Sequence, residues 1–127
     1  TPFEDVVPAL HKLRDAGYLL GSLTNGNADI NRLGLGHLFH VSVSAESAGS
    51  AKPEPGMFEQ ACQVAGVTAV EMAHIGDELE TDIAGALSAG ATAIWMNRFA
   101  RPTDPNLAAH ATVCNMDELL ALFRVTG

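Results

Sequence analysis

Apolar residues recur along this chain in two alternating patterns, a helical period and short continuous runs. Residues 1–4 carry a helix-start signature, with a cap residue, a proline at the first helical position and a Glu three residues after the cap. Apolar positions at helical spacing follow at Val6, Leu10 and Leu13, and Gly17 supplies a stop. The mostly apolar run at residues 18–23 then predicts a buried strand.

The same alternation continues to the end of the chain. Asn27 or Asp29 can cap a short helix, whereas residues 45–56 are too rich in Gly, Ser and Pro for regular structure. A capping-box sequence occupies residues 68–71. Further strands are expected at residues 40–44, 72–75, 91–96 and 111–114. Further helices are expected to bury one face each, from Phe58 to Ala65, from Leu79 to Leu87 and from Met116 to Phe123.

Helices that alternate with strands imply a parallel sheet covered by helices on both faces. The predicted fold class is therefore α/β, a three-layer doubly wound parallel sheet. A length of 127 residues with 47% hydrophobic residues fits a single compact domain, and no internal repeat or second domain is visible over residues 1–127.

Charge and hydrophobicity exclude several classes of partner. Fifteen Asp and Glu against seven Lys and Arg give a formal net charge of -8, which argues against nucleic acid. No apolar stretch approaches the ~18 residues that span a bilayer, so we expect no membrane partner and a cytoplasmic protein. Cys62 and Cys114 form no C-x-x-C and lie in segments expected to be buried, so both are predicted to be reduced core thiols.

Polar residues follow three of the predicted parallel strands. Thr24 and Asn25 follow the first strand, Lys52 lies in the loop after the second, and Asp77 and Asp82 follow the third. Because ligands bind at the carboxyl ends of strands in such sheets, these side chains are expected to meet in one crevice. A hydroxyl, an amide, an ammonium and carboxylates that hold a cation are what a transferring phosphoryl group requires.

The acidic turn after residues 72–75 has two interpretations on its residues alone. Carboxylates of Asp77 and Asp82 near one point would suit a hard cation such as Mg²⁺. Alternatively, Asp77 only caps the following helix, while Glu78, Glu80 and Asp82 favour its dipole.

The order and spacing of these motifs resemble the haloacid dehalogenase-like hydrolase superfamily over nearly the whole chain. The matching segments are Leu23-Thr24-Asn25-Gly26, Ala51-Lys52-Pro53 followed by Met57-Phe58, and His74-Ile75-Gly76-Asp77 followed by Asp82, Gly85-Ala86 and Ala89-Gly90. Residues 23–26, together with Gly34-Leu35-Gly36 and Phe39, are most similar to phosphatases that act on flavin mononucleotide and on sugar or ribityl phosphates.

This resemblance implies a role for each candidate residue. Thr24 would hydrogen-bond the transferring phosphoryl group, assisted by the backbone near Asn25. Lys52 would offset charge on the phosphoryl oxygens and on the nucleophile, which makes it and Thr24 the catalytic residues of this chain. Asp77 would bind Mg²⁺ directly, and Asp82 would support the metal without touching it or would orient Lys52. The substrate would be a small phosphorylated metabolite.

The chain departs from the family at one point. Family members begin with a strand that ends in Asp-x-Asp-x-Thr, whose first Asp is the nucleophile and whose second is the general acid/base, and this motif is absent. The chain is therefore expected to be the carboxyl-terminal core portion of a longer hydrolase, without the cap, and nearly inert alone.

The missing strand has a structural consequence. In the family it lies between the strands that end at Thr24 and Asp77. Without it, either those strands pair directly or another chain fills the gap, so self-association or strand exchange is expected.

Three functions remain open. The first is a Mg²⁺-dependent phosphate monoester hydrolase that uses a phosphoaspartyl intermediate. The second is a 2-haloacid dehalogenase, which uses the same nucleophile without a metal. The third is a non-catalytic module that binds phosphate or a partner chain. Asp77 and Asp82 favour the first, and the substrate cannot be inferred because the cap, which largely sets selectivity, is absent.

Overall fold

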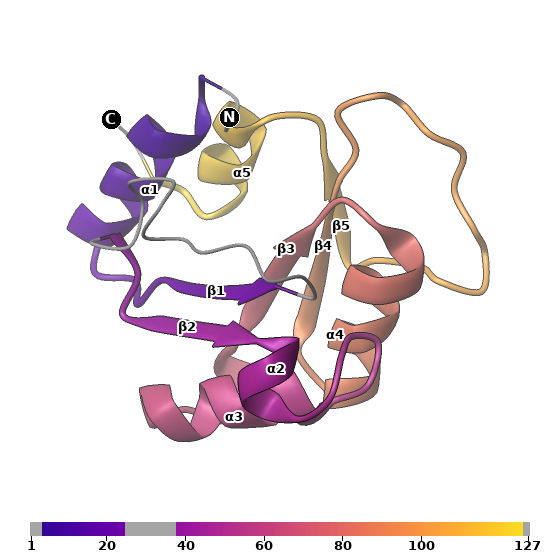
Figure 1. Ribbon diagram of the computed structural model, residues 1–127. Helices are drawn as coiled ribbons and strands as arrows, with labels where there is room; N and C mark the ends of the chain where they lie inside the picture. The colour runs from indigo at the N-terminus through magenta and orange to yellow at the C-terminus, as the bar shows by residue number, and fades with distance from the viewer. Residues whose placement is uncertain (1–3, 25–37, 126–127) are drawn as a thin grey trace.

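The computed structural model describes residues 4–24 and 38–125. The predicted helix start at residues 1–3, the candidate residue Asn25 and the helix predicted after Asn27 or Asp29 lie outside the described residues. Elements alternate in the order α1 (Val6–Asp15), β1 (Gly21–Thr24), β2 (Val41–Ser44), α2 (Ala45–Ala48), α3 (Gly56–Ala65), β3 (Ala73–Gly76), α4 (Ala84–Ala89), β4 (Thr92–Met96), β5 (Ala111–Val113) and α5 (Met116–Leu122) (Figure 1). Short helical turns precede β3 and α4, namely η2 (Ala69–Glu71) and η3 (Leu79–Ile83).

All paired strands of the described chain are parallel, but they form two sheets. One sheet pairs β1 with β2, and the other has the order β3-β4-β5. The centre of the larger sheet aligns Ile75 with Ile94, and Ile94 with Ala111. The predicted α/β class with parallel strands is confirmed, and the sheet is incomplete where a central strand was expected to be missing.

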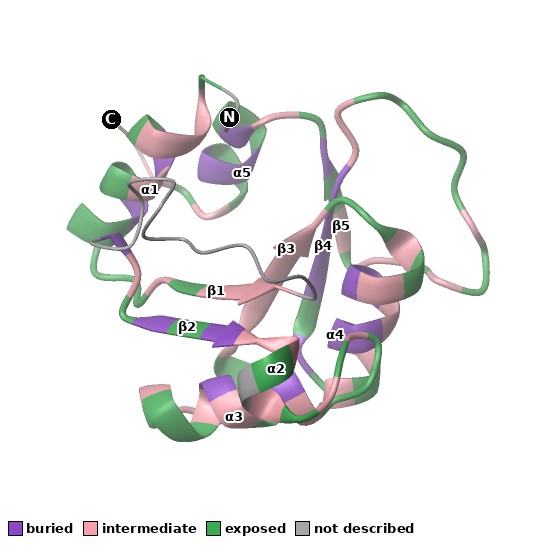
Figure 2. Cartoon of the chain, viewed as in Figure 1, coloured by how far each residue is buried: buried purple, intermediate pink, exposed green. Residues whose placement is uncertain are grey.

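Helices cover both faces of the strands. On one face, α1 and α5 contribute Ala9, Leu13 and Leu119 to a core cluster that includes Ile94 of β4 (Figure 1). On the other face, the rings and aliphatic chains of α3, η3 and α4 pack against Trp95. The central strand of the larger sheet is accordingly buried from residue 93 to residue 96 (Figure 2). None of the described helices is long and apolar enough to cross a membrane.

A cavity of about 350 Å³ lies between β1 and β3. Leu23 borders it from β1, and His74 and Ile75 border it from β3. Leu13 of α1 and Ala61 of α3 also line it, so helices from both faces of the strands border the cavity. The edges of β1 and β3 that face it carry no ladder partner in the described chain. Direct pairing of these two strands, one of the two expected outcomes, does not occur.

The predicted buried strand at residues 18–23 is wrong in extent and burial. Only Gly21–Thr24 forms β1, and Tyr18 and Leu19 are 42% and 56% exposed. The physical reason is the open edge, because β1 has a partner on one side only and its amino-terminal residues border the cavity.

Two smaller expectations also need correction. The loop predicted at residues 45–56 begins with a single helical turn, α2, and ends in the first residue of α3. Cys114 is exposed and Cys62 is half-buried, so neither lies deep in the core, although both are free thiols. Cys114 directly follows β5, the strand at the edge of the sheet, which explains its exposure.

Candidate active site

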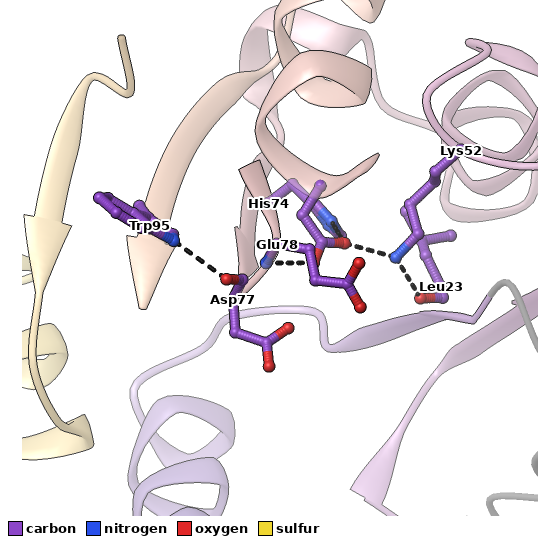
Figure 3. Close-up of polar contacts among 7 residues, drawn as sticks. Leu23, Lys52, His74, Asp77, Glu78 and Trp95 are labelled. Carbon is purple, nitrogen blue, oxygen red and sulfur yellow. Dashed lines mark hydrogen bonds and ion pairs between the residues drawn. The ribbon is translucent and has the colours of Figure 1, made fainter. Parts of the chain in front are cut away.

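Lys52 lies where the carboxyl ends of β1 and β3 face each other. Its ammonium donates to the carbonyl oxygen of Leu23, at the end of β1, with an Nζ to O distance of 3.0 Å (Figure 3). Its Nζ atom also lies 2.5 Å from the Oδ1 atom of Asp82, a residue that follows β3. Lys52 therefore links the two sheets across the gap at their carboxyl ends.

Asp82 is the one charged residue among the described positions that is buried, with 6% exposure. A second donor, the Nε2 atom of His74, lies 3.0 Å from the same Oδ1 atom. The Oδ2 atom accepts the backbone N–H of Glu78 at 3.2 Å. Burial acts to raise the pKa of Asp82, but the hydrogen bonds from His74 and Lys52 outweigh it and lower the pKa to about 2. The carboxylate is thus ionised and uses both oxygens within the protein.

The turn between β3 and α4 is shaped to hold this carboxylate. Gly76 ends β3, and a Cβ atom at this position would overlap the side chain of Asp82. The next residues form the π-helical turn η3, in which the N–H groups of Asp82 and Ile83 both bond to the carbonyl of Glu78. Asp82 folds back and bonds the Glu78 N–H, so it satisfies a donor at the start of its own helix.

Asp77 points away from this network. It is exposed, and no described residue hydrogen-bonds its carboxylate, whereas its backbone carbonyl accepts the indole N–H of Trp95 at 3.0 Å (Figure 3). Trp95 is 2% exposed, so the indole fixes the backbone of Asp77 from within the core. The alternative in which Asp77 caps the helix has no hydrogen bond to support it, because the cap position is Glu78 and the capping carboxylate is that of Asp82.

Asp77 offers an exposed carboxylate to a cation, but the described residues form no complete metal site. Groups of three or more His, Cys, Asp or Glu that could hold a metal are absent from the described part of the chain. Asp82 is already engaged within the protein, since Lys52 and His74 bond its Oδ1 atom and the Glu78 N–H bonds its Oδ2 atom. The donor set therefore fits a hard cation at Asp77 only when further oxygen ligands are supplied.

Thr24 is half-buried at the end of β1, next to the residue whose carbonyl binds Lys52. The structure thus brings together the carboxyl end of β1, Lys52 and Asp82. Asp77 lies earlier than Asp82 in the turn after β3, and its carboxylate points away from them. Thr24, Asn25, Lys52, Asp77 and Asp82 remain candidates for the roles that the family resemblance implies.

His74 is the residue that the sequence did not single out as part of the site. Strand periodicity contains a signal for it, because residues two apart share a face and Gly76 is the position against which Asp82 packs. His74 therefore lies on the face of β3 that receives the carboxylate. Its ring meets Phe58 of α3 edge to face, with centroids 4.9 Å apart and planes at 84°.

Comparison with known proteins identifies the family of this chain. The sequence model of the haloacid dehalogenase-like hydrolase family matches residues 1–90. The chain is 39% identical over 102 residues to a glyceraldehyde 3-phosphate phosphatase of Methanopyrus kandleri, a match that covers 76% of this chain and 44% of the relative. It is 35% identical over 115 residues to a phosphoserine phosphatase of Thermus thermophilus, covering 87% of this chain and 46% of the relative.

Solved structures share the fold. A 2-haloacid dehalogenase from Pseudomonas syringae superposes with a TM-score of 0.93 at 38% identity, covering 98% of this chain and 54% of that protein. A phosphatase from Thermococcus onnurineus superposes with a TM-score of 0.88 at 33% identity, covering 97% of this chain and 58% of that protein. The chain spans about half the length of these relatives. It belongs to the haloacid dehalogenase-like hydrolases.

Proposed function

We propose that this chain is the carboxyl-terminal part of a Mg²⁺-dependent phosphate monoester hydrolase that acts through a phosphoaspartyl intermediate. One observation carries the proposal: the Lys52 ammonium is fixed between the carboxyl ends of β1 and β3 by Leu23 and Asp82. That position faces the gap from which the nucleophile of the missing strand would emerge. The phosphatase names of the relatives described above support the same reaction class.

Each residue of this chain has a role that follows from its chemistry. Lys52 is held in place by one ionised carboxylate, and its ammonium offsets negative charge on the phosphoryl oxygens and on an aspartate nucleophile. Thr24, at the end of β1, donates its hydroxyl hydrogen to a phosphoryl oxygen, and the backbone at Asn25 adds a second donor. Asp82 does not touch the substrate, and it keeps Lys52 in place.

Asp77 is the residue of this chain that would hold Mg²⁺. Its exposed carboxylate is a hard oxygen ligand, and Mg²⁺ takes about six such ligands, so water and the upstream segment would complete the site. When bound, the ion offsets charge on the phosphoryl oxygens. Metal binding can be measured without activity through the fluorescence of Trp95, the single tryptophan of these 127 residues, because its indole bonds the Asp77 carbonyl. The signal should respond to Mg²⁺ in the complete protein and not in D77N.

The first test of the function compares this chain with a form extended upstream through any Asp-x-Asp strand. Hydrolysis of an aryl phosphate is measured with and without Mg²⁺. We expect turnover only in the extended form, and loss of turnover in K52A and D77N. An inert extended form that is folded and binds a partner chain would instead support the non-catalytic module.

Dehalogenation of a 2-haloacid is the second candidate, because the dehalogenase of Pseudomonas syringae is 38% identical to this chain. The two reactions can be distinguished by whether turnover requires the metal. Turnover of a 2-haloacid that persists in a chelator and in D77N would favour dehalogenation, whereas chelator-sensitive release of phosphate would favour the phosphatase.

Self-association is the expected behaviour of this chain when nothing fills the gap. The cavity of about 350 Å³ and the unpaired edges of β1 and β3 offer backbone donors and acceptors to an extended strand. Sedimentation velocity over a range of concentrations should show dimers or larger species. A monodisperse monomer at high concentration would contradict this expectation.

A further inference from the structure

We infer that His74 is a positioning residue of this site, which acts on Lys52 through the Oδ1 atom of Asp82. The inference rests on the proposed function, and it adds to the site a residue from the interior of β3. It concerns the hydrogen-bond geometry that aims the ammonium, and His74 itself contacts neither substrate nor reacting atoms.

The first step is that Lys52 and His74 share one acceptor atom. The Lys52 Nζ and His74 Nε2 atoms lie 2.5 Å and 3.0 Å from Asp82 Oδ1. A carboxylate oxygen has two lone pairs, so two donors fill it and define the rotation of the carboxyl group. The ionised carboxylate is an acceptor only, which means that Nε2 carries the ring proton. Without the donor at His74, one lone pair of Oδ1 is unfilled, and only Lys52 and the Glu78 N–H still hold the carboxyl group.

The second step is that His74 is itself held rigidly. Its side chain is 11% exposed, and its ring packs edge to face on Phe58, which is 1% exposed. Phe58 in turn packs against Gly85, where an added Cβ would come within 2.9 Å of the Phe58 ring. Helix α3, helix α4 and strand β3 together therefore fix the direction in which Nε2 points.

The third step connects this geometry to the gap between the sheets. Asp82 is anchored to the β3 side by His74 and by the Glu78 N–H, whereas Lys52 reaches from there to Leu23 on the β1 side. A small rotation of the carboxylate moves the ammonium relative to the end of β1. His74 thus helps to set where the positive charge lies relative to a phosphoryl group. Loss of such indirect support typically costs about 10- to 100-fold in activity.

Two substitutions separate the hydrogen bond from the packing. His74→Phe keeps a ring against Phe58 but removes the donor, whereas His74→Gln places an amide nitrogen about where Nε2 lies. In the full-length protein we expect H74F to lower kcat for an aryl phosphate by roughly 10-fold or more with a smaller change in KM. H74Q should recover most of that loss. His40→Phe is the matched control, because His40 is exposed at the amino-terminal end of β2, and it should leave kcat unchanged.

A double-mutant cycle tests whether His74 acts through Asp82. In a D82A background the acceptor is gone, so H74F should cause no further loss of kcat. Equal kcat in wild type, H74F and H74Q would overturn the inference, as would equal losses in H74F and H74Q or additive effects of H74F and D82A. If D82A does not fold, the comparison of H74F with H74Q still decides.

A second measurement keeps the inference separate from the proposed function. The ammonium NMR signal of Lys52 can be recorded on this 127-residue chain, because hydrogen bonds to Leu23 and Asp82 slow exchange of its protons with water. We expect the signal in wild type and H74Q and its broadening in H74F. If the full-length protein hydrolyses no phosphate ester, the proposed function fails. The Lys52 signal then tests by itself whether His74 positions the ammonium. An unchanged signal in H74F would overturn the positioning role.

Discussion

Replacing Gly76 with Ala should disrupt the site by a purely steric route. An added Cβ would occupy the space of the Asp82 side chain, whereas a real Cβ atom keeps more than about 3 Å from its neighbours. Asp82 cannot move aside without cost, because Lys52, His74 and the Glu78 N–H hold both of its oxygens. Overpacking in a core costs ~1–3 kcal/mol, and a lost hydrogen bond to a charged group costs ~1.5–3 kcal/mol. We therefore expect G76A to lower the free energy of unfolding by about 2.5–6 kcal/mol, the sum of the two costs.

Gly21→Ala is the matched control for this substitution. Gly21 also lies in a strand, and a Cβ there would meet its nearest neighbour, the Val41 carbonyl oxygen, at an ordinary 3.5 Å. Because Ala is intrinsically favoured over Gly in a strand by roughly 0.5–1 kcal/mol, G21A should be neutral or slightly stabilising. Urea unfolding followed by Trp95 fluorescence gives both values, provided that the slope with denaturant is unchanged. A stability of G76A within about 0.5 kcal/mol of G21A would refute the reasoning.

Three further substitutions test other contacts. The folded-state pKa of Asp82, about 2, lies below its unfolded value, so the ionised carboxylate stabilises the fold above pH ~4. This stabilisation, about 2 kcal/mol, is lost as the pH falls toward 2. Urea titrations at a series of pH values should show this acid-dependent loss in wild type and not in D82N. Asp5 accepts two hydrogen bonds from Arg98, at 3.1 and 2.8 Å, and one from the Met116 N–H. D5A should therefore lower the free energy of unfolding by about 1 kcal/mol, and by less in high salt. An unchanged thermal midpoint in D5A would contradict this. The Asn115 side chain caps α5 by accepting the Glu118 N–H at 2.8 Å. N115A should lower the free energy of unfolding by about 1 kcal/mol, whereas N115D should retain the cap. Equal stabilities of the two variants would exclude a capping role.

Much of the fold could be predicted from the sequence, because its signals are local. Gly66 and Gly90 end α3 and α4 in the left-handed conformation that glycine favours, as their positions after apolar helical patterns predict. The capping box at residues 68–71 forms with both of its hydrogen bonds. The last helix begins after Asn115, although the Glu118 carboxylate bonds the Cys114 N–H instead of the cap residue. These features depend on a few neighbouring residues, so no knowledge of tertiary contacts is needed.

The errors arise where tertiary contacts decide. The exposure of Tyr18 and Leu19 follows from the open edge of β1, which no pattern within residues 18–23 reveals. His74 joins the network because it lies in a strand and contacts Asp82, eight positions later in a helical turn, while its ring packs on Phe58. The separate directions of Asp77 and Asp82 likewise come from the π-helical turn, because a regular first turn would not fold Asp82 back onto the Glu78 N–H in this way.

Stability alone does not account for the buried network around Asp82. Removing a carboxylate and an ammonium from water costs several kcal/mol per ion, and their attraction repays this only with excellent geometry. Apolar pairs of similar volume are often as stable as buried ion pairs, so a stable core alone would not require Lys52 and Asp82. Here the ion pair lies between the carboxyl ends of β1 and β3, bonded to Leu23 and His74, which both line the cavity. In the proposed hydrolase this charge would hold an anion, and Asp82, His74 and Gly76 are the residues that would keep it in place.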